Sequence, residues 1–321
     1  MHIQDGLLDV KTCVGTAVLS AGMLGYAIHR VGRTFADRRA PLMGVMAATL
    51  FAAQMMNFPI PGGTSGHLLG GILAAVMLGP WSGLVVLAVV LVVQSLLMQD
   101  GGITALGANV FNVGVIGSVV GYAIFEPIRR VIGGQKGIVV GAMLAAWFTV
   151  ILGATACSIE LALSGTYRSM AATLGVMLLV HSMIGLGESV ITGLAIAFVL
   201  RTRPDLVYGQ NNGSGALARS GQVIVAGLAV AFVVAILLSP FASSLPDGLE
   251  STLGRLGIDT SASEPMFSAL MPDYVPRGME KVRFAGSVAG GVGTVFVFAV
   301  AFVVSLGLSS KPSAAHTPHA S

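Results

Sequence analysis

Long apolar segments follow one another along most of the chain, separated by short polar or glycine- and proline-rich stretches. Most of these segments approach or exceed the roughly 20 apolar residues that a helix needs to cross about 30 Å of hydrocarbon. The pattern predicts an all-α polytopic membrane protein with about nine transmembrane helices. The predicted spans are Val10–His29, Pro41–Asn57, His67–Gly79, Trp81–Met98, Thr104–Phe125, Gly137–Leu163, Met170–Leu200, Gln222–Leu238 and Phe284–Leu308. The third is short for a full crossing.

The apolar pattern breaks between the second and third spans, at residues 58–67. This stretch contains two prolines and three glycines and ends in His67. Proline lacks a backbone donor and clashes with the preceding helical turn, so a continuous helix is not expected here. We predict irregular backbone near the outer face, which is tolerated at membrane depth only where protein buries it or where it lines a cavity.

Basic residues indicate which loops face the cytoplasm. They cluster after the first span (Arg30, Arg33, Arg38, Arg39) and beside later ones (Arg129, Arg130, Lys136, Arg201, Arg203). Loops rich in Lys and Arg stay inside, which predicts an outer amino terminus and a location in the cell (inner) membrane. Only 10% of the residues are charged, the net charge is +3, and no basic patch is interleaved with aromatic residues, so no nucleic-acid partner is expected.

Composition divides the chain into two membrane modules. The first module covers residues 1–203 and contains about seven of the predicted helices. Residues 204–220 are polar and rich in Gly, Asn and Ser, which is typical of a flexible linker. The second module, residues 221–308, has two spans around an outer loop that contains Pro246–Glu250. A short polar tail, residues 309–321, is expected to be disordered.

The first residues of the chain offer a metal chelate. The amine of Met1, the backbone amide nitrogen of His2 and the His2 imidazole can bind one ion in a nearly flat arrangement that suits Ni(II) or Cu(II). His67, predicted on the same outer side, is the natural fourth nitrogen, and Asp5 is a candidate hydrogen-bond acceptor for one of the histidine rings. The alternative to the chelate is a frayed terminus with an ordinary exposed histidine. The alternative for Asp5 is a turn residue before Gly6.

Polar side chains within and at the ends of the predicted spans form a second set of candidates. Gln54, Asn57 and Asn109 are expected to bond between helices and to surround the metal loop. His181 and Glu188 lie two turns apart, on one face of the seventh span. Ionisable groups inside a membrane are costly and usually point into the bundle or a cavity, so these two have either a structural role or one in ion passage or gating.

Three stretches carry a resemblance to the CbiM/NikM family, the nickel- and cobalt-specific substrate-capture components of energy-coupling factor transporters. They are Met1-His2-Ile3-Gln4-Asp5-Gly6, Phe51–Gly71 and Gln99–Asn109, and the resemblance extends over about residues 1–200. The second module is similar to the small CbiN/NikN partner, with its Pro-Asp-Gly-Leu-Glu signature at residues 246–250.

The resemblance implies that the metal sits on nitrogens of Met1, His2 and His67, as substrate and not as a permanently bound cofactor. It also implies that a transmembrane coupling subunit and cytoplasmic ATPase subunits supply the energy, so that this chain is not itself an enzyme. The absence of a Gly-x-x-x-x-Gly-Lys-Ser/Thr loop agrees with that division. Planar nitrogen ligation favours nickel over cobalt, and the resemblance implies the same for Asp5, where many cobalt-type relatives carry Glu.

Two other functions fit some of the same residues. A proton- or sodium-coupled secondary carrier would use His181 and Glu188 as its relay. An intramembrane metalloenzyme is disfavoured, because the best ligands lie at a chain terminus and in a loop and the sequence has no His-Glu-x-x-His helix.

Overall fold

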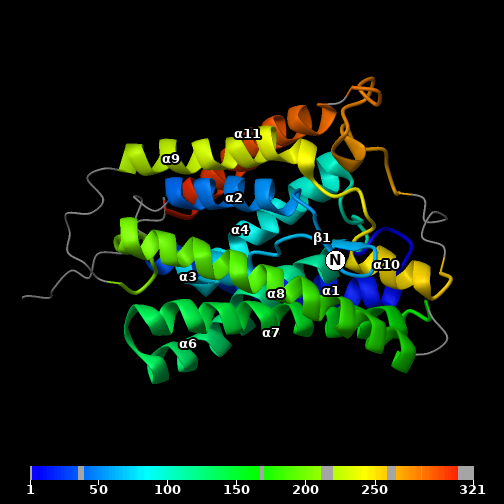
Figure 1. Cartoon of the computed structure of the whole chain (residues 1–321), viewed down its shortest axis with the longest axis horizontal. Coiled ribbons are helices and arrows are strands. Elements are labelled where there is room, and N and C mark those ends of the chain that lie inside the picture. The colour runs from blue at the N-terminus through cyan, green and yellow to red at the C-terminus, as the bar shows by residue number, and fades with distance from the viewer. Residues whose placement is uncertain are drawn as a thin grey trace, which may run out of the picture.

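The computed structural model describes residues 2–34, 40–166, 170–210, 220–258, 265–282 and 284–309. Met1, residues 211–219 of the predicted linker and the tail from residue 310 lie outside the described residues. Within these ranges the chain is almost entirely helical and has one short hairpin (Figure 1). The all-α prediction therefore holds in its main feature.

Eleven α-helices carry the fold in the described part of the chain. They are α1 (Val10–Thr34), α2 (Ala40–Gln54), α3 (Gly71–Leu78), α4 (Pro80–Val93), α5 (Leu106–Asn109), α6 (Gly121–Ile132), α7 (Gly134–Leu163), α8 (Met170–Thr202), α9 (Ser220–Phe232), α10 (Gly248–Arg255) and α11 (Ala285–Ser309). Wider π-helical turns continue α4 (Gln94–Met98), join α5 to α6 (Val110–Val120) and continue α9 (Val233–Leu238).

Seven helical segments of the described chain are long and apolar enough to cross a membrane. They include α1, α4, α7, α8, α9 and α11 with their continuations, and the continuous run from α5 to α6. Helix α2 is also apolar but has only 15 residues. These helices make the chain a multi-pass membrane protein.

The third predicted span, His67–Gly79, is longer than the helix that forms there. Helix α3 contains only eight residues, which at 1.5 Å per residue reach about 12 Å and cannot cross the hydrocarbon. Gly70 and Gly79, both with positive φ, lie at its two ends. All eight residues of α3 are buried. It is a half-helix inside the bundle, so the count of nine spans is not confirmed.

The segment before α3 is a β-hairpin and not the irregular loop that its prolines and glycines predicted. Strands β1 (Phe58–Ile60) and β2 (Thr64–Gly66) pair antiparallel, with Phe58 opposite Gly66. Gly62 and Gly63 both have positive φ and close the turn, a conformation that other residues adopt only with strain. The hairpin directs β2, and therefore the next residue, His67, into the molecule.

The second module packs on α2. Helices α9 and α11 lie along α2 on one side of the molecule, α6, α7 and α8 lie on the opposite side, and α3 and α4 lie between them (Figure 1). Gly44 of α2 makes room for Phe298, because a Cβ atom there would lie 2.9 Å from its ring. Gly293 of α11 makes room for Phe51 in the same way.

The first part of the predicted linker is packed rather than extended. Pro204–Leu206 form a helical turn, and Val207 is buried. The Tyr208 amide donates to the carbonyl of Val76 at 2.9 Å. Any flexible connection is therefore shorter than the 204–220 segment predicted from composition.

Candidate metal site

The residues after Met1 are held inside the protein and are not a frayed end. Ile3 is fully buried and His2 is 5% exposed. The Ile3 amide donates to Asn109 Oδ1 at 2.8 Å, and Asn109 Nδ2 donates back to the Ile3 carbonyl at 3.0 Å. The Gly102 amide bonds to the same carbonyl at 2.8 Å. Asn109 thus fixes the backbone next to His2. The sequence predicted only that it would bond between helices and lie around the metal loop.

The rings of His2 and His67 are stacked. Their centroids lie 5.1 Å apart with an interplanar angle of 18°, and His67 is 6% exposed. Nε2 of His2 has no hydrogen-bond partner among the described residues. Met1, the third predicted ligand residue, lies outside the described residues. The fold therefore brings together two imidazoles from segments that are far apart in sequence.

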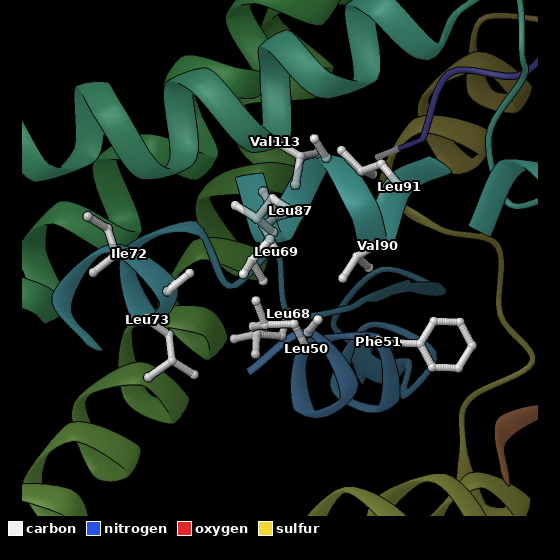
Figure 2. Close-up of a cluster of buried hydrophobic side chains, with 14 of the residues drawn as sticks. Leu50, Phe51, Leu68, Leu69, Ile72, Leu73, Leu87, Val90, Leu91 and Val113 are labelled. Atoms are coloured by element: carbon white, nitrogen blue, oxygen red, sulfur yellow. The ribbon is translucent and has the colours of Figure 1, made fainter. Parts of the chain in front are cut away.

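The loop that carries His67 is anchored by its two next residues. Leu68 and Leu69 insert into an apolar cluster formed by α2, α3, α4 and Val113 (Figure 2). Their backbone is also fixed, because the Leu69 amide donates to Glu188 Oε2 at 2.7 Å and the Gly70 amide donates to Oε1 at 2.9 Å. Gln54 Nε2 donates to the Leu69 carbonyl at 2.8 Å.

This burial has an electrostatic consequence for His67. Removal from water, the largest effect, lowers the pKa of its ring to about 3, because a low dielectric disfavours the charged imidazolium. The ring is therefore neutral at physiological pH, and one of its nitrogens can offer an electron pair to a metal ion.

Among the described residues Asp5 bonds to Thr104 and Met266 and to no histidine, contrary to the prediction. Its Oδ1 accepts from the Thr104 amide at 2.8 Å and from the Thr104 hydroxyl at 2.6 Å, and its Oδ2 accepts from the Met266 amide at 3.2 Å. Burial alone would raise its pKa, but these hydrogen bonds outweigh it and lower the pKa of the Asp5 carboxyl. Asp5 lies three residues past His2, and its side chain is used to fasten the terminus.

The carboxylate beside His2 is Asp100, which the sequence analysis did not single out. Nδ1 of His2 donates to Asp100 Oδ1 at 2.7 Å, and the hydroxyl of Tyr274 donates to Oδ2 at 2.6 Å. Burial opposes ionisation of Asp100, but the charge and hydrogen bond of His2 and the Tyr274 bond hold its pKa well below the usual range. Tyr274 belongs to the second module, so the Asp100 carboxylate accepts hydrogen bonds from both modules.

His181 and Glu188 share a buried face of α8 but have different surroundings. Both oxygens of Glu188 accept backbone amides of the His67 loop, as described above. His181 is 1% exposed, and its Nδ1 lies 2.9 Å from the Met177 carbonyl. No hydrogen bond joins the two side chains within the described part of the chain, and both Glu188 oxygens are occupied by the His67 loop.

A small cavity lies beside His67. Its walls come from β2, the following loop, α7, α8 and the first residue of α10. The lining residues are Gly66, His67, Leu69, Val150, His181, Ile184 and Gly248. Its only polar side chains are two imidazoles.

The second module is hydrogen-bonded to the hairpin that carries His67. The Ser65 amide and the Thr64 hydroxyl donate to the Pro246 carbonyl at 2.8 and 3.1 Å, and the Ser65 hydroxyl donates to the Leu245 carbonyl at 2.7 Å. Asn57, predicted to surround the site, contributes through its backbone carbonyl, which accepts the Ser243 amide at 2.8 Å. The Pro-Asp-Gly-Leu-Glu segment thus forms part of the wall around the loop.

Side chains alone do not complete a metal site here. In the part of the chain that the structure describes, no three His, Cys, Asp or Glu side chains are arranged to hold a metal ion. A four-coordinate ion next to His2 and His67 therefore needs backbone or terminal nitrogens, which is the donor set that an amino-terminal X-His unit provides.

Each module matches a known protein family. Residues 2–206 match the family model described as cobalt uptake substrate-specific transmembrane region, CbiM, and residues 221–310 match the PDGLE domain. A putative fused nickel transport protein, NikMN, of Archaeoglobus fulgidus is 38% identical over 95% of this chain and 98% of its own length. A probable fused nickel transport protein, LarMN, of Lactiplantibacillus plantarum is 32% identical over 87% of this chain and 90% of its own.

A solved structure covers the first module. The crystal structure of a truncated transition metal transporter aligns with 63% of this chain and 99% of its own length, at 33% identity and a TM-score of 0.57. The relatives are nickel and cobalt transport proteins, in agreement with the two buried imidazoles beside the terminus. The chain belongs to the CbiM family of metal-uptake membrane proteins and carries a PDGLE domain after its CbiM region.

Proposed function

We propose that this chain captures Ni(II), or Co(II), at the outer face as the substrate-specific component of an ATP-driven uptake transporter, and that the ion is released to the cytoplasm. A transmembrane coupling subunit and cytoplasmic ATPase subunits supply the energy. The observation that carries the proposal is the stacking of His2 on His67, 5.1 Å apart, at the anchored start of the chain. The nickel transport relatives, similar over nearly the full length, support the choice of substrate.

The donor atoms follow from covalent geometry. With the Met1 amine and the His2 amide bound, the His2 nitrogen that closes a six-membered chelate ring is Nδ1, and a His67 nitrogen completes a plane that suits Ni(II). In the structure Nδ1 donates to Asp100 Oδ1. Capture therefore replaces the hydrogen bond between His2 and Asp100 with a bond from Nδ1 to the metal. The proton leaves Nδ1, and the His2 amide and the Met1 ammonium release theirs, so that all three nitrogens offer an electron pair.

The second module controls the loading of the ion into this site. Its Pro246 carbonyl accepts two bonds from the hairpin before His67, and its Tyr274 bonds to the carboxylate that holds His2. Movement of the module would therefore alter the bond that holds His2 and the hairpin bonds ahead of His67, while Glu188 keeps the loop after His67 in place. Deletion of residues 222–308 is expected to reduce nickel uptake strongly, and unchanged uptake without that segment would refute a loading role.

Energy coupling is tested by uptake of radioactive nickel into cells or vesicles that contain the chain with or without its partner subunits. We expect uptake only when the coupling and ATPase subunits are present and the ATPase is active. Uptake by this chain alone, lost on adding an uncoupler or on removing a sodium gradient, would instead support the secondary carrier with His181 and Glu188. Glu188 is engaged by two backbone amides, which favours the ATP-driven mechanism.

A further inference from the structure

His181 has a ring nitrogen that makes no hydrogen bond within the described part of the protein. Its Nδ1 lies 2.9 Å from the Met177 carbonyl, an acceptor, so Nδ1 carries the ring proton and Nε2 carries the free electron pair. Nε2 is buried without a hydrogen-bond partner among the described residues. A buried polar atom without a hydrogen-bond partner is costly inside a protein, and most such atoms are paired. The unpaired Nε2 of His181 therefore calls for an explanation.

The ring of His181 faces the same cavity as His67. The other lining residues are glycine or aliphatic, so the two imidazoles are the only side chains there that can bind a metal. Imidazole is a common ligand for Ni(II), Co(II), Cu(II) and Zn(II). The cavity is thus a place where an ion can be held by nitrogen before or after it sits in the terminal chelate.

The second module covers this nitrogen. Gly248, the first residue of α10, lies against the ring, and a Cβ atom at that position would be 2.9 Å from Nε2 and 2.7 Å from the Ile184 side chain. Glycine is therefore the residue that lets α10 approach α8 this closely. Withdrawal of α10 would uncover Nε2 from the side on which the second module lies.

The geometry points to His181 as a loading ligand for the divalent metal ion. This inference rests on the proposed function and extends it by one residue and one step. When α10 withdraws, Nε2 of His181 replaces one water of the hydrated ion, and no proton is released because Nε2 is unprotonated. The ion is held in the cavity beside His67 and then passes to the planar chelate of the amino terminus, while α10 closes over the emptied nitrogen.

Blocking the chelate should trap the ion at the loading position. Acetylation of the Met1 amine removes this donor, so the full-length acetylated chain is titrated with Ni(II) alone. We expect a weak, paramagnetic, pale green complex in place of the yellow planar one. This complex should be lost in the acetylated chain carrying His181→Gln and kept in the one carrying His29→Gln, a change at an exposed histidine of α1.

The native-terminus chain supplies the kinetic test and separates the two claims. His181→Gln should slow the appearance of the yellow complex by about tenfold, since a ligand on the path is missing, and should leave its final spectrum unchanged. Equal rates in His181→Gln and wild type, or a trapped complex that is absent or survives His181→Gln, would overturn the inference. Failure of the unmodified chain to form the planar complex would overturn the proposed function itself.

Discussion

The two histidines of the candidate site are supported in opposite ways. The loop of His67 is fixed by Glu188, whose two oxygens accept amides of the first module only. His2 is bound to Asp100, which has one oxygen on His2 and the other on Tyr274 of the second module. The first carboxylate therefore makes a rigid platform inside one module, whereas the second is a contact that movement between modules can alter. Capture needs both a fixed ligand and one that can exchange a hydrogen bond for the metal.

The largest effect is expected from Glu188→Ala. It leaves two buried amides without an acceptor, each costing about 1–3 kcal/mol, so we expect the free energy of unfolding to fall by roughly 2–5 kcal/mol and nickel affinity to fall at least about tenfold as His67 loses its place. Denaturant unfolding and nickel titration of the purified chain measure the two effects.

Glu126→Ala is the matched control for this substitution. Its carboxylate pairs with Arg129 and Arg130 in α6, in a partly exposed site where such pairs contribute little. Equal effects of the two glutamate substitutions would show that Glu188 does not form the platform under His67.

An intermediate effect is expected from Gly248→Ala. The added methyl group would meet His181 and Ile184 at under 3 Å, so α10 cannot remain docked without a shift. We expect nickel uptake to fall by roughly tenfold, while the final spectrum of the purified complex stays the same. Gly254→Ala, in the same helix with nothing within 4 Å of its Cβ, is the matched control. Equal nickel uptake by the two variants would show that the close docking of α10 is not needed for metal loading.

The smallest effect is expected from Tyr274→Phe, which removes one hydroxyl and keeps the ring. Asp100 then has fewer donors and holds the proton of His2 more tightly, so the chelate should form about three- to tenfold more slowly, in line with the loss of a bond worth about 1 kcal/mol. The effect should disappear in the background of Asp100→Asn, as a double-mutant cycle would show. An effect of the same size in that background would mean that Tyr274 acts on the module and not on His2.

Sequence patterns predicted the parts of this site that depend on local chemistry. The X-His start, the helix-breaking residues before His67 and the seven-residue spacing of His181 and Glu188 are all visible along the chain. The helical membrane architecture follows from apolar segment length. The half-helix α3 was mistaken for a span because a buried short helix and a membrane crossing have similar composition.

Contacts between distant segments could not be predicted in the same way. Asp100 sits in a turn, after Gln99 with φ of +57°, and nothing local distinguishes a turn aspartate from one that holds His2 98 positions earlier. Tyr274 comes from the segment between α10 and α11, which lacks helical or strand periodicity. Asp5 was the nearest acidic residue to His2 in sequence, yet the fold turns it towards Thr104.

The central claim is a planar nitrogen site formed by the amino terminus and His67. It is tested most directly by titrating the purified chain, with its native amino terminus, with Ni(II) and then Co(II) while recording visible absorbance and magnetism. We predict a yellow, diamagnetic one-to-one nickel complex that is lost on His67→Ala and on acetylation of the Met1 amine. Absence of binding, or binding indifferent to both changes, would contradict the account.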